Sequence, residues 1–354
     1  MKEVILLPFG DQGHIDALLT ELADLVEQGR ESEFAMILPT SQLLHDYRRR
    51  LVRKASRQLN LTTFDELVAA ALQAAGNKVT GISGQMATEI ISDILQEKAA
   101  ELPALGRCSS REMASELAFC LGQLRRVKAV PEDLATLIRE EDQVLADLAV
   151  VWQEYLSFLK SRSLADLEEQ YRLAVQALSG VPWLQKVRQL HLCWFFDFEP
   201  QQLDILQAVC VLVPAVTLWL PYDHVAHEDC LEGTLAQLQA MGFKLQRQAS
   251  GQRSQLTASL FLLPPEPAAH PPVRGLGAPR LKQELELVAS EIKSLAAAGA
   301  RGEDICLVVP DMDKYLPLMG SMYKERGIDL SVPLRANLTG VPWVSEILKI
   351  WRAA

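Results

Sequence analysis

The sequence predicts an α/β fold in which a parallel sheet is interrupted by an all-helical insertion and followed by the start of a second α/β unit. Short apolar segments with strand character alternate with helix-period segments near the N-terminus and again after residue 188. Between these stretches only the helical period is found, and a Pro- and Gly-rich segment later separates the last part of the chain. The predicted parts are a first domain at 1–84 and 188–263, the helical insertion at 85–187, a linker at 264–279 and the beginning of a second domain at 280–354.

The composition is that of a globular protein, with 49% hydrophobic and 23% charged residues among 354. No apolar run reaches about 18 residues and no signal-peptide pattern is present, which predicts a cytoplasmic protein without membrane contact. The net charge of −10 argues against a surface that coats nucleic acid throughout, while a local basic groove stays open. Six cysteines without C-x-x-C spacing lie mostly in apolar segments, which indicates buried free thiols and no metal site.

The first predicted strand, Val4–Leu7, leads into a loop with Gly10 and Gly13 and then into the helix Ile15–Val26. This order is typical of a nucleotide-binding site. In a P-loop, backbone N–H groups wrap the phosphates, a lysine neutralises them and a hydroxyl holds Mg²⁺.

The chemistry of a working P-loop is missing here. His14, Ile15 and Asp16 stand where the lysine and the hydroxyl belong. Asp16 also opposes phosphate, because a carboxylate in the first turn takes up the positive end of the helix dipole. We therefore interpret Gly10, Gly13 and His14 as a degenerate nucleotide site, and we expect neither ATP nor Mg²⁺ to bind there.

The second predicted strand, Phe34–Leu38, precedes a helix that begins around Thr40, Ser41 and Gln42. The basic residues of this helix recur at spacings of three and four, so several share one face. They are Arg49, Arg50, Arg53, Lys54 and Arg57. Two interpretations stay open: a solvated charged face, or a patch that contacts phosphates with help from the neutral donors at the helix start.

The third predicted strand is Leu59–Thr63, and Asp65 is the expected N-cap of the helix Glu66–Ala75. Helical periodicity then predicts the insertion helices Ala87–Ala99, Ser110–Arg125, Pro131–Glu140, Val144–Lys160 and Asp166–Leu178. Trp152, Tyr155 and Phe158 lie on one side of their helix, a stripe that we interpret as core.

The strand pattern returns at Leu190–Phe196, which is apolar enough to be covered on both faces. Pro200 is suited to open the next helix, and Ala215–Leu220 is a further strand. Asp197 and Glu199 lie where a Walker B pair would bind Mg²⁺. Because Phe198 separates them and the P-loop lysine is absent, we favour helix capping and loop hydrogen bonds over catalysis.

The last part of the chain shows little sheet. It predicts the helices Lys282–Ala298, Asp313–Arg326 and Val341–Trp351, with one buried strand at Ile305–Val309. So little sheet cannot bury the first of these helices well. We therefore expect the sequence to be the N-terminal part of a longer protein.

This order of elements resembles superfamily I helicases of the UvrD and RecB type, and most closely the AddB (RexB) subunits of AddAB helicase–nucleases. The earlier motifs that carry the resemblance are Ala165-Asp166, Phe196-Asp197-Phe198-Glu199-Pro200-Gln201 and Ser259-Leu260-Phe261. The more specific ones are Glu284–Leu295, Asp304–Asp311, Tyr315, Gly327-Ile328-Asp329 and Val341–Val344, which are similar to the start of the family's second motor domain.

The resemblance implies RecA-like domains and a helicase-like subunit of a complex that processes double-strand breaks. It implies an AddA-like helicase–nuclease partner in a heterodimer, and DNA ends, single- or double-stranded, as the substrate. In this family a C-terminal nuclease domain with an iron–sulfur cluster cuts one strand. Neither can be assigned to this chain, so the resemblance places them beyond residue 354, and we expect no catalytic residue and no cofactor here.

The resemblance also supplies candidate DNA contacts. Thr40 and Gln42 match a helicase motif that contacts the DNA backbone, and Thr63 with Phe64 matches the next motif, in which an aromatic ring stacks on a base. A second interpretation stays open for Phe64, as a core residue that covers the sheet. The full candidate set is Thr40, Gln42, Arg49, Arg50, Arg53, Lys54, Thr63 and Phe64. The leading hypothesis is a DNA-contacting subunit that does not hydrolyse ATP. Two alternatives are an interaction scaffold that never touches DNA and an NTPase with an atypical P-loop.

Overall fold

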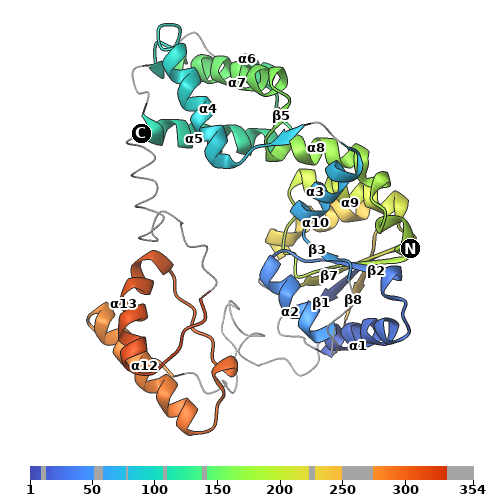
Figure 1. The fold of residues 1–354 in the computed structure, drawn as a ribbon, viewed down its shortest axis with the longest axis vertical. Coiled ribbons are helices and arrows are strands. Elements are labelled where there is room, and N and C mark those ends of the chain that lie inside the picture. Colours follow the sequence, from blue (N-terminus) through green and yellow to red (C-terminus); the bar gives the residue numbers. More distant parts are fainter. Residues whose placement is uncertain are drawn as a thin grey trace. The chain divides into compact units, whose positions relative to one another are not determined.

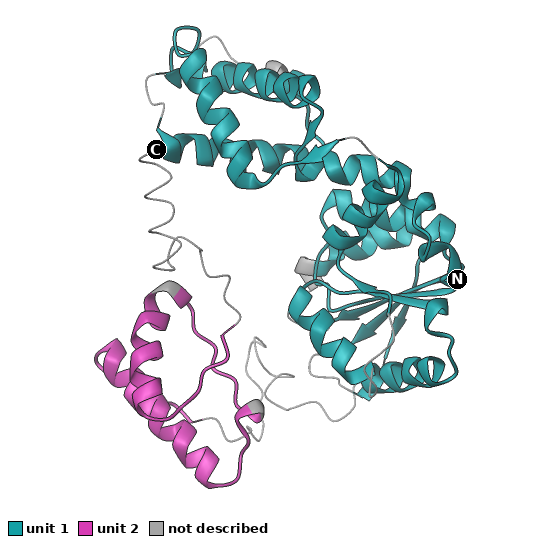
Figure 2. Ribbon diagram, in the orientation of Figure 1, with its two compact units in different colours: residues 1–269 teal, residues 270–354 magenta. Residues whose placement is uncertain are grey.

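The computed structural model describes residues 1–8, 13–51, 59–76, 79–106, 110–137, 142–222, 228–248 and 274–332. The chain divides into two compact units, Met1–Ala269 and His270–Ala354, which Figure 2 shows in different colours. The first unit combines a sheet that has helices on both faces with a separate helical bundle (Figure 1). The candidate site residues all belong to this unit.

Six parallel strands form the sheet, in the order β3-β2-β6-β7-β1-β8 (Figure 1). They are β1 (Lys2–Leu7), β2 (Phe34–Ile37), β3 (Leu61–Thr62), β6 (Gln189–Cys193), β7 (Ala215–Pro221) and β8 (Lys244–Arg247). Val4 lies opposite Leu218 in the β1–β7 pair, and Ile37 lies opposite Leu192 in the β2–β6 pair. The predicted parallel sheet, which the chain leaves after β3 and rejoins at β6, is confirmed.

One face of the sheet is covered by α1 (Gly13–Glu27) and α2 (Ser41–Leu51). Successive strand residues point to opposite faces, so strands that are covered twice must be apolar throughout. Ile5 and Met36 point to this face and lie in one buried cluster with Leu22 of α1.

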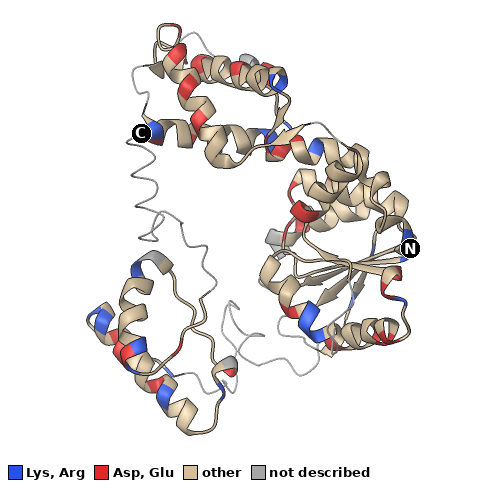
Figure 3. Ribbon diagram, viewed as in Figure 1, with Lys and Arg blue, Asp and Glu red and all other residues tan. Residues whose placement is uncertain are grey.

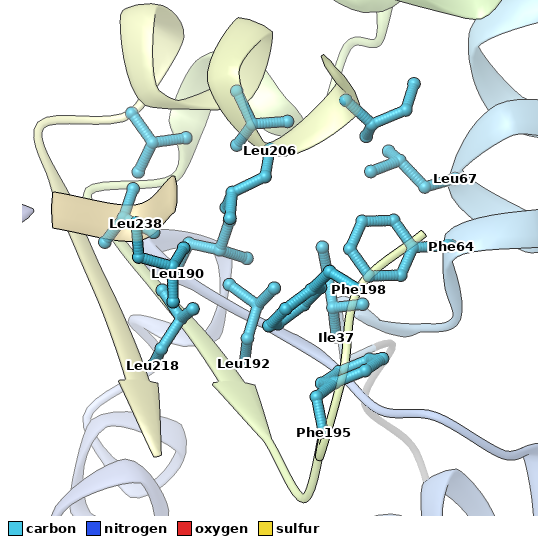
Figure 4. Packing of buried hydrophobic residues seen from close by; sticks show 14 of the residues in the cluster. Ile37, Phe64, Leu67, Leu190, Leu192, Phe195, Phe198, Leu206, Leu218 and Leu238 are labelled. Atoms are coloured by element: carbon cyan, nitrogen blue, oxygen red, sulfur yellow. The ribbon is translucent and has the colours of Figure 1, made fainter. Parts of the chain in front are cut away.

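The other face is covered by four helices. They are α3 (Phe64–Ala74), α8 (Leu167–Ala177), α9 (Pro200–Leu212) and α10 (Glu228–Ala240). Figure 4 shows their side chains against the strands: Leu67, Leu206 and Leu238 lie over Leu192 and Leu218. This is the larger of the two cores, so the sheet is fixed mainly from this side.

The helices that follow β2 and β6 leave the sheet on opposite faces, although these strands are neighbours. Leu44 of α2 packs in the first core and Ile205 of α9 in the second. Right-handed crossovers cause this, because the chain runs toward β3 after β2 and toward β7 after β6. The carboxyl ends of β2 and β6 therefore flank a topological switch point, where open parallel sheets bind their ligands.

A helical bundle is inserted between β3 and β6. It contains α4 (Gly84–Glu97), α5 (Arg111–Arg126), α6 (Pro131–Leu137) and α7 (Gln143–Ser161). Trp152 and Tyr155 are buried in its core and Phe158 is partly buried, so the aromatic stripe is core as predicted. The prediction of no strand in this region is wrong in one detail, because β5 (Leu164–Ala165) pairs with β4 (Thr80–Gly81).

Helix α8 falls within the predicted insertion but packs on the sheet. Its residues Tyr171 and Ala174 lie in the core that contains the strands, and the Tyr171 hydroxyl donates to Asp65 Oδ1 of α3 at 2.7 Å. The chain between α8 and β6, with the short 3₁₀ turns Leu178–Gly180 and Leu184–Lys186, follows the same core through Leu178 and Leu184.

The second unit contains α12 (Leu281–Ala297) and α13 (Met312–Glu325), joined through the 3₁₀ turn Gly302–Asp304. The strand predicted at Ile305–Val309 is not formed. Ile305 has extended backbone angles, but none of the residues 274–332 supplies a neighbouring strand for a hydrogen-bonded ladder. The helix predicted at Val341–Trp351 lies outside the described residues.

Two other expectations concern single residues and the membrane. Cys193 is buried as predicted, but Cys306 is exposed. Burial raises the pKa of the Cys193 thiol well above its usual range, which makes that sulfur a poor nucleophile and metal ligand. Across the described parts of the chain, no helix combines the length and the apolar character that a bilayer span requires.

Candidate nucleic-acid interface

The candidate site lies at the carboxyl edge of the sheet, where parallel strands end side by side. Three connections meet around the switch point: the start of α2 after β2, Thr63 after β3, and the loop 194–199 after β6. We call this last segment the β6 loop.

The first turn of α2 is exposed, as a phosphate-contacting segment requires. The Thr40 side-chain oxygen accepts the Leu43 N–H at 3.2 Å and so caps the helix. Thr40, Ser41 and Gln42 all face solvent. The first N–H groups of a helix have no intrahelical partner, and the macrodipole makes this end attractive to anions. Thr40 and Gln42 therefore lie exposed at a helix N-terminus, and their contact with DNA stays a prediction.

The predicted basic face is only partly available. Arg49 is exposed and pairs with Asp46 of its own helix at 3.2 Å, a contact that solvent weakens. Arg50 pairs with Asp16 of α1 and lies 5.8 Å from the centre of the Tyr47 ring. Arg53 and Lys54 lie outside the described residues, as does Arg57.

The Arg50–Asp16 ion pair links the basic face of α2 to the helix that follows the degenerate P-loop. Gly13 and His14 begin α1, and Gly10 lies outside the described residues. Asp16, in the first turn, places a negative charge where a P-loop helix receives phosphate, and Arg50 balances that charge. Two groups that the sequence assigns to different sites thus neutralise each other.

Thr63 and Phe64 have structural roles that the sequence did not assign. Thr63, not Asp65, is the N-cap of α3: its side chain accepts the Glu66 N–H at 3.2 Å, and the Thr63 N–H donates to Glu66 Oε2 at 3.3 Å. This is a capping box, in which both groups are satisfied reciprocally. The expectation of an Asp65 cap is therefore wrong.

Phe64 is buried, with 3% of its surface exposed. Its ring meets Phe195 edge-on at 5.4 Å between centroids and Phe198 at 6.3 Å, and these two rings stack on each other at 5.1 Å (Figure 4). A ring so enclosed has no face to offer a base. Phe64 is a core residue that packs against the β6 loop. Of its two interpretations, the structure supports the core residue and not the base-stacking ring.

The β6 loop presents a different aromatic side chain. The strand predicted to reach Phe196 ends at Cys193, because Trp194 adopts a left-handed backbone with φ of 68°. The turn buries Phe195 and Phe198 and leaves Phe196 with 54% of its surface exposed. The sequence reasoning missed Phe196. The signal available was a row of aromatics that continues beyond a doubly covered strand into a polar, Pro-terminated loop.

Hydrogen bonds fix this loop at both ends. The Trp194 N–H donates to the Trp219 carbonyl at 3.2 Å, and the Trp194 indole donates to the Tyr47 hydroxyl. Asp197 Oδ1 accepts from the Phe198 N–H at 2.7 Å and from the Thr234 hydroxyl at 2.8 Å. Asp197 thus holds the loop to α10.

The Walker B interpretation has little support in this geometry. The Glu199 carboxylate binds Arg126 at 3.0 Å and Gln201 at 3.0 Å, and Asp197 is engaged as above. Both carboxylates are thus used in loop and helix contacts, as the capping interpretation predicts. Among the residues that the structure describes, no cluster of three or more His, Cys, Asp or Glu side chains is arranged to hold a metal ion.

One buried histidine lies in the strand that carries the β6 loop. His191 Nδ1 accepts from the Trp219 indole at 3.3 Å, so the proton is on Nε2, which has no hydrogen-bond partner among the described residues. Burial lowers the pKa of His191 to about 4, so the ring is neutral at pH 7. The same side of the sheet holds Tyr47, whose pKa is raised chiefly by burial.

Comparison with known proteins matches the chain to a protein family. The family model described as ADDB, N-terminal, covers residues 10–266, well over half of the 354 residues. It includes every candidate residue named above. No curated protein sequence matches the chain.

Proposed function

The chain belongs to the family of AddB N-terminal regions, which are parts of helicase–nuclease repair complexes, and we propose that it contacts single-stranded DNA in such a complex without hydrolysing ATP. Family membership also implies an AddA-type partner. The proposal includes a heterodimer with that partner, a cytoplasmic location, and the division of the chain into a first RecA-like domain, a helical insertion, a linker and a second motor-like domain.

The observation that supports DNA contact most strongly is the set of exposed groups at the switch point. Thr40 and Gln42 offer polar donors at a helix N-terminus, Arg49 offers a cation, and Phe196 offers an aromatic ring. Polar and cationic groups suit phosphates, and an exposed ring suits an unstacked base. A single strand presents both at once, whereas a duplex hides its bases inside the helix.

The start of α1 lacks the side chains that ATP hydrolysis requires. The P-loop lysine and hydroxyl are replaced by His14, Ile15 and Asp16. Asp16 repels phosphate and is held in the first turn by Arg50. A nucleotide would have to displace this ion pair without gaining a lysine or an Mg²⁺ ligand in return.

The test is a binding titration with a fluorescein-labelled oligothymidine at low salt. We expect Phe196→Ala to weaken binding by about tenfold, because stacking on one base is worth about 1–3 kcal/mol. Phe119→Ala is the matched control: Phe119 is likewise exposed, at 66%, but lies on α5 in the bundle. It should bind as the wild type does. Equal losses in both variants, or in neither, would contradict the proposed site.

The scaffold alternative draws on the net charge of −10 and on the neutralised Arg50. It predicts that the oligonucleotide binds no more tightly than a Kd of roughly 10⁻⁴ M, which is the weak end of nonspecific DNA binding. The NTPase alternative predicts ATP affinity that is lost on changing Gly13 or Asp16. Each outcome would replace the proposal with a named competitor.

A further inference from the structure

The end of α5 contacts the start of α9, and this contact joins the helical bundle to the β6 loop. Arg126, the last residue of α5, binds Glu199 Oε1 through Nη1 at 3.0 Å and Glu168 Oε1 through Nε at 3.4 Å. Lys128, just beyond the helix, binds Asp204 of α9 at 2.8 Å. Figure 3 shows basic and acidic segments close together where α5 meets α8.

Glu199 is both the N-cap of α9 and the last residue of the β6 loop. Its N–H donates to Gln202 Oε1 at 3.1 Å, and its carboxylate binds Gln201 of α9 through Oε2 and Arg126 of the bundle through Oε1. Phe196 lies three residues earlier, between the buried anchors Phe195 and Phe198. Glu199 ends the short segment that carries Phe196, so its ion pair with Arg126 adds to the contacts that hold this segment.

We propose that Arg126 is a positioning residue: by holding Glu199 it fixes the β6 loop in the conformation that presents Phe196 to single-stranded DNA. This inference rests on the function proposed above. It gives the helical bundle a part in DNA binding without requiring the bundle to touch the strand.

An alternative role for Arg126, direct binding of a DNA phosphate, is disfavoured by the charges around it. A cavity of about 540 Å³ beside the contact is lined by Arg125, Arg126, Lys128 and Arg172 among others. Each of these cations has a carboxylate partner, at Asp166, Glu199, Asp204 and Glu169 respectively. A basic wall that is neutralised internally has little charge left for a phosphate.

The test uses two single variants in the intact chain, Arg126→Ala and Glu199→Gln, titrated with the labelled oligothymidine. The side chains of Arg126 and Glu199 are 31% and 41% exposed, so each loss should weaken binding about two- to fivefold. The double variant should be no weaker than the worse single one, because both remove the same contact. Arg126→Lys should keep part of the affinity.

Glu199→Gln is the sharper variant, because the competing explanation predicts the opposite sign. If the two residues acted on DNA by charge alone, removing the carboxylate would strengthen binding. Removing Arg126 would then lower the slope of log affinity against log salt by about 1, the value for one lost phosphate contact. Tighter or unchanged binding by Glu199→Gln, or a reduced salt slope for Arg126→Ala, would overturn the positioning role. Arg172→Ala, which removes an exposed ion pair within α8 and leaves the Arg126–Glu199 pair intact, is the matched control and should bind normally.

Amide hydrogen exchange separates this inference from the proposed function. Arg126→Ala should speed exchange in residues 194–202 without DNA present, while Arg172→Ala should not. Unchanged exchange would overturn the positioning role even if the wild type binds DNA. A wild type that fails to bind DNA would instead remove the function on which the inference rests.

Discussion

Acidification tests the burial of His191 beneath the candidate site. The folded-state pKa of about 4 lies below the ordinary 6.5, because burial disfavours the charged ring. As pH falls below about 6.5 the unfolded chain takes up a proton that the folded chain refuses, so the free energy of unfolding drops until pH reaches about 4. The pKa of about 4 in the folded chain and the pKa of 6.5 in the unfolded chain together correspond to a loss of about 3 kcal/mol in the free energy of unfolding.

The variant His191→Gln isolates this contribution. Glutamine does not titrate, and its side-chain oxygen can still accept from the Trp219 indole. Urea unfolding at pH 7, 6, 5 and 4.5, followed by tryptophan fluorescence, should show the wild type losing stability relative to His191→Gln. His45→Gln, at an exposed histidine of α2, is the control and should follow the wild type. Parallel curves for wild type and His191→Gln would refute the assignment of a buried neutral ring.

Three further predictions concern the elements around the β6 loop. Phe64→Ala should lower the free energy of unfolding by about 3–5 kcal/mol in a urea titration, because it empties an enclosed aromatic site; a loss below about 1 kcal/mol would contradict its burial. Thr63→Ala should cost about 1 kcal/mol in the same assay through the lost cap, and Thr63→Ser should restore most of it; equal stability of all three would contradict the capping box. Asp16→Asn should release Arg50 and tighten oligothymidine binding about two- to fivefold, whereas weaker binding would place Asp16 in another role.

The α/β fold follows from the sequence because its strands are locally distinctive. Val4–Leu7 and Phe34–Leu38 are apolar at every position, which two covered faces demand, and each is followed by a helix-period segment. The edge strand β8 is not predicted. Its sequence Lys244–Arg247 contains one apolar residue, since an edge strand partly faces solvent, and only pairing with β1 makes it a strand.

The predicted ends of two elements, the start of α3 and the end of β6, differ from the structure. Thr63 and Asp65 are both good caps, and only the glutamate three residues after Thr63 favours the first. The end of β6 depends on a left-handed Trp194, a conformation that no sequence pattern announces for a bulky residue.

The placement of some candidate residues could be inferred from the sequence, whereas their contact with DNA stays a prediction. Thr40 and Gln42 depend on the strand–helix order alone, so their exposed placement could be inferred. Phe64 is buried because Phe195 and Phe198 pack against its ring. Arg50 is neutralised by Asp16 because α1 packs beside α2. These contacts join residues far apart in the sequence, so periodicity and spacing carry no information about them.

We propose that this chain holds single-stranded DNA at the carboxyl edge of its sheet without using ATP. The direct measurement is an anisotropy titration of labelled oligothymidine at two salt concentrations, each with and without ATP and Mg²⁺. We predict binding that weakens as salt rises, with a slope of about 0.7 per phosphate contacted, and that does not change with nucleotide. Absence of binding at low salt, or an affinity that depends on ATP, would contradict this function.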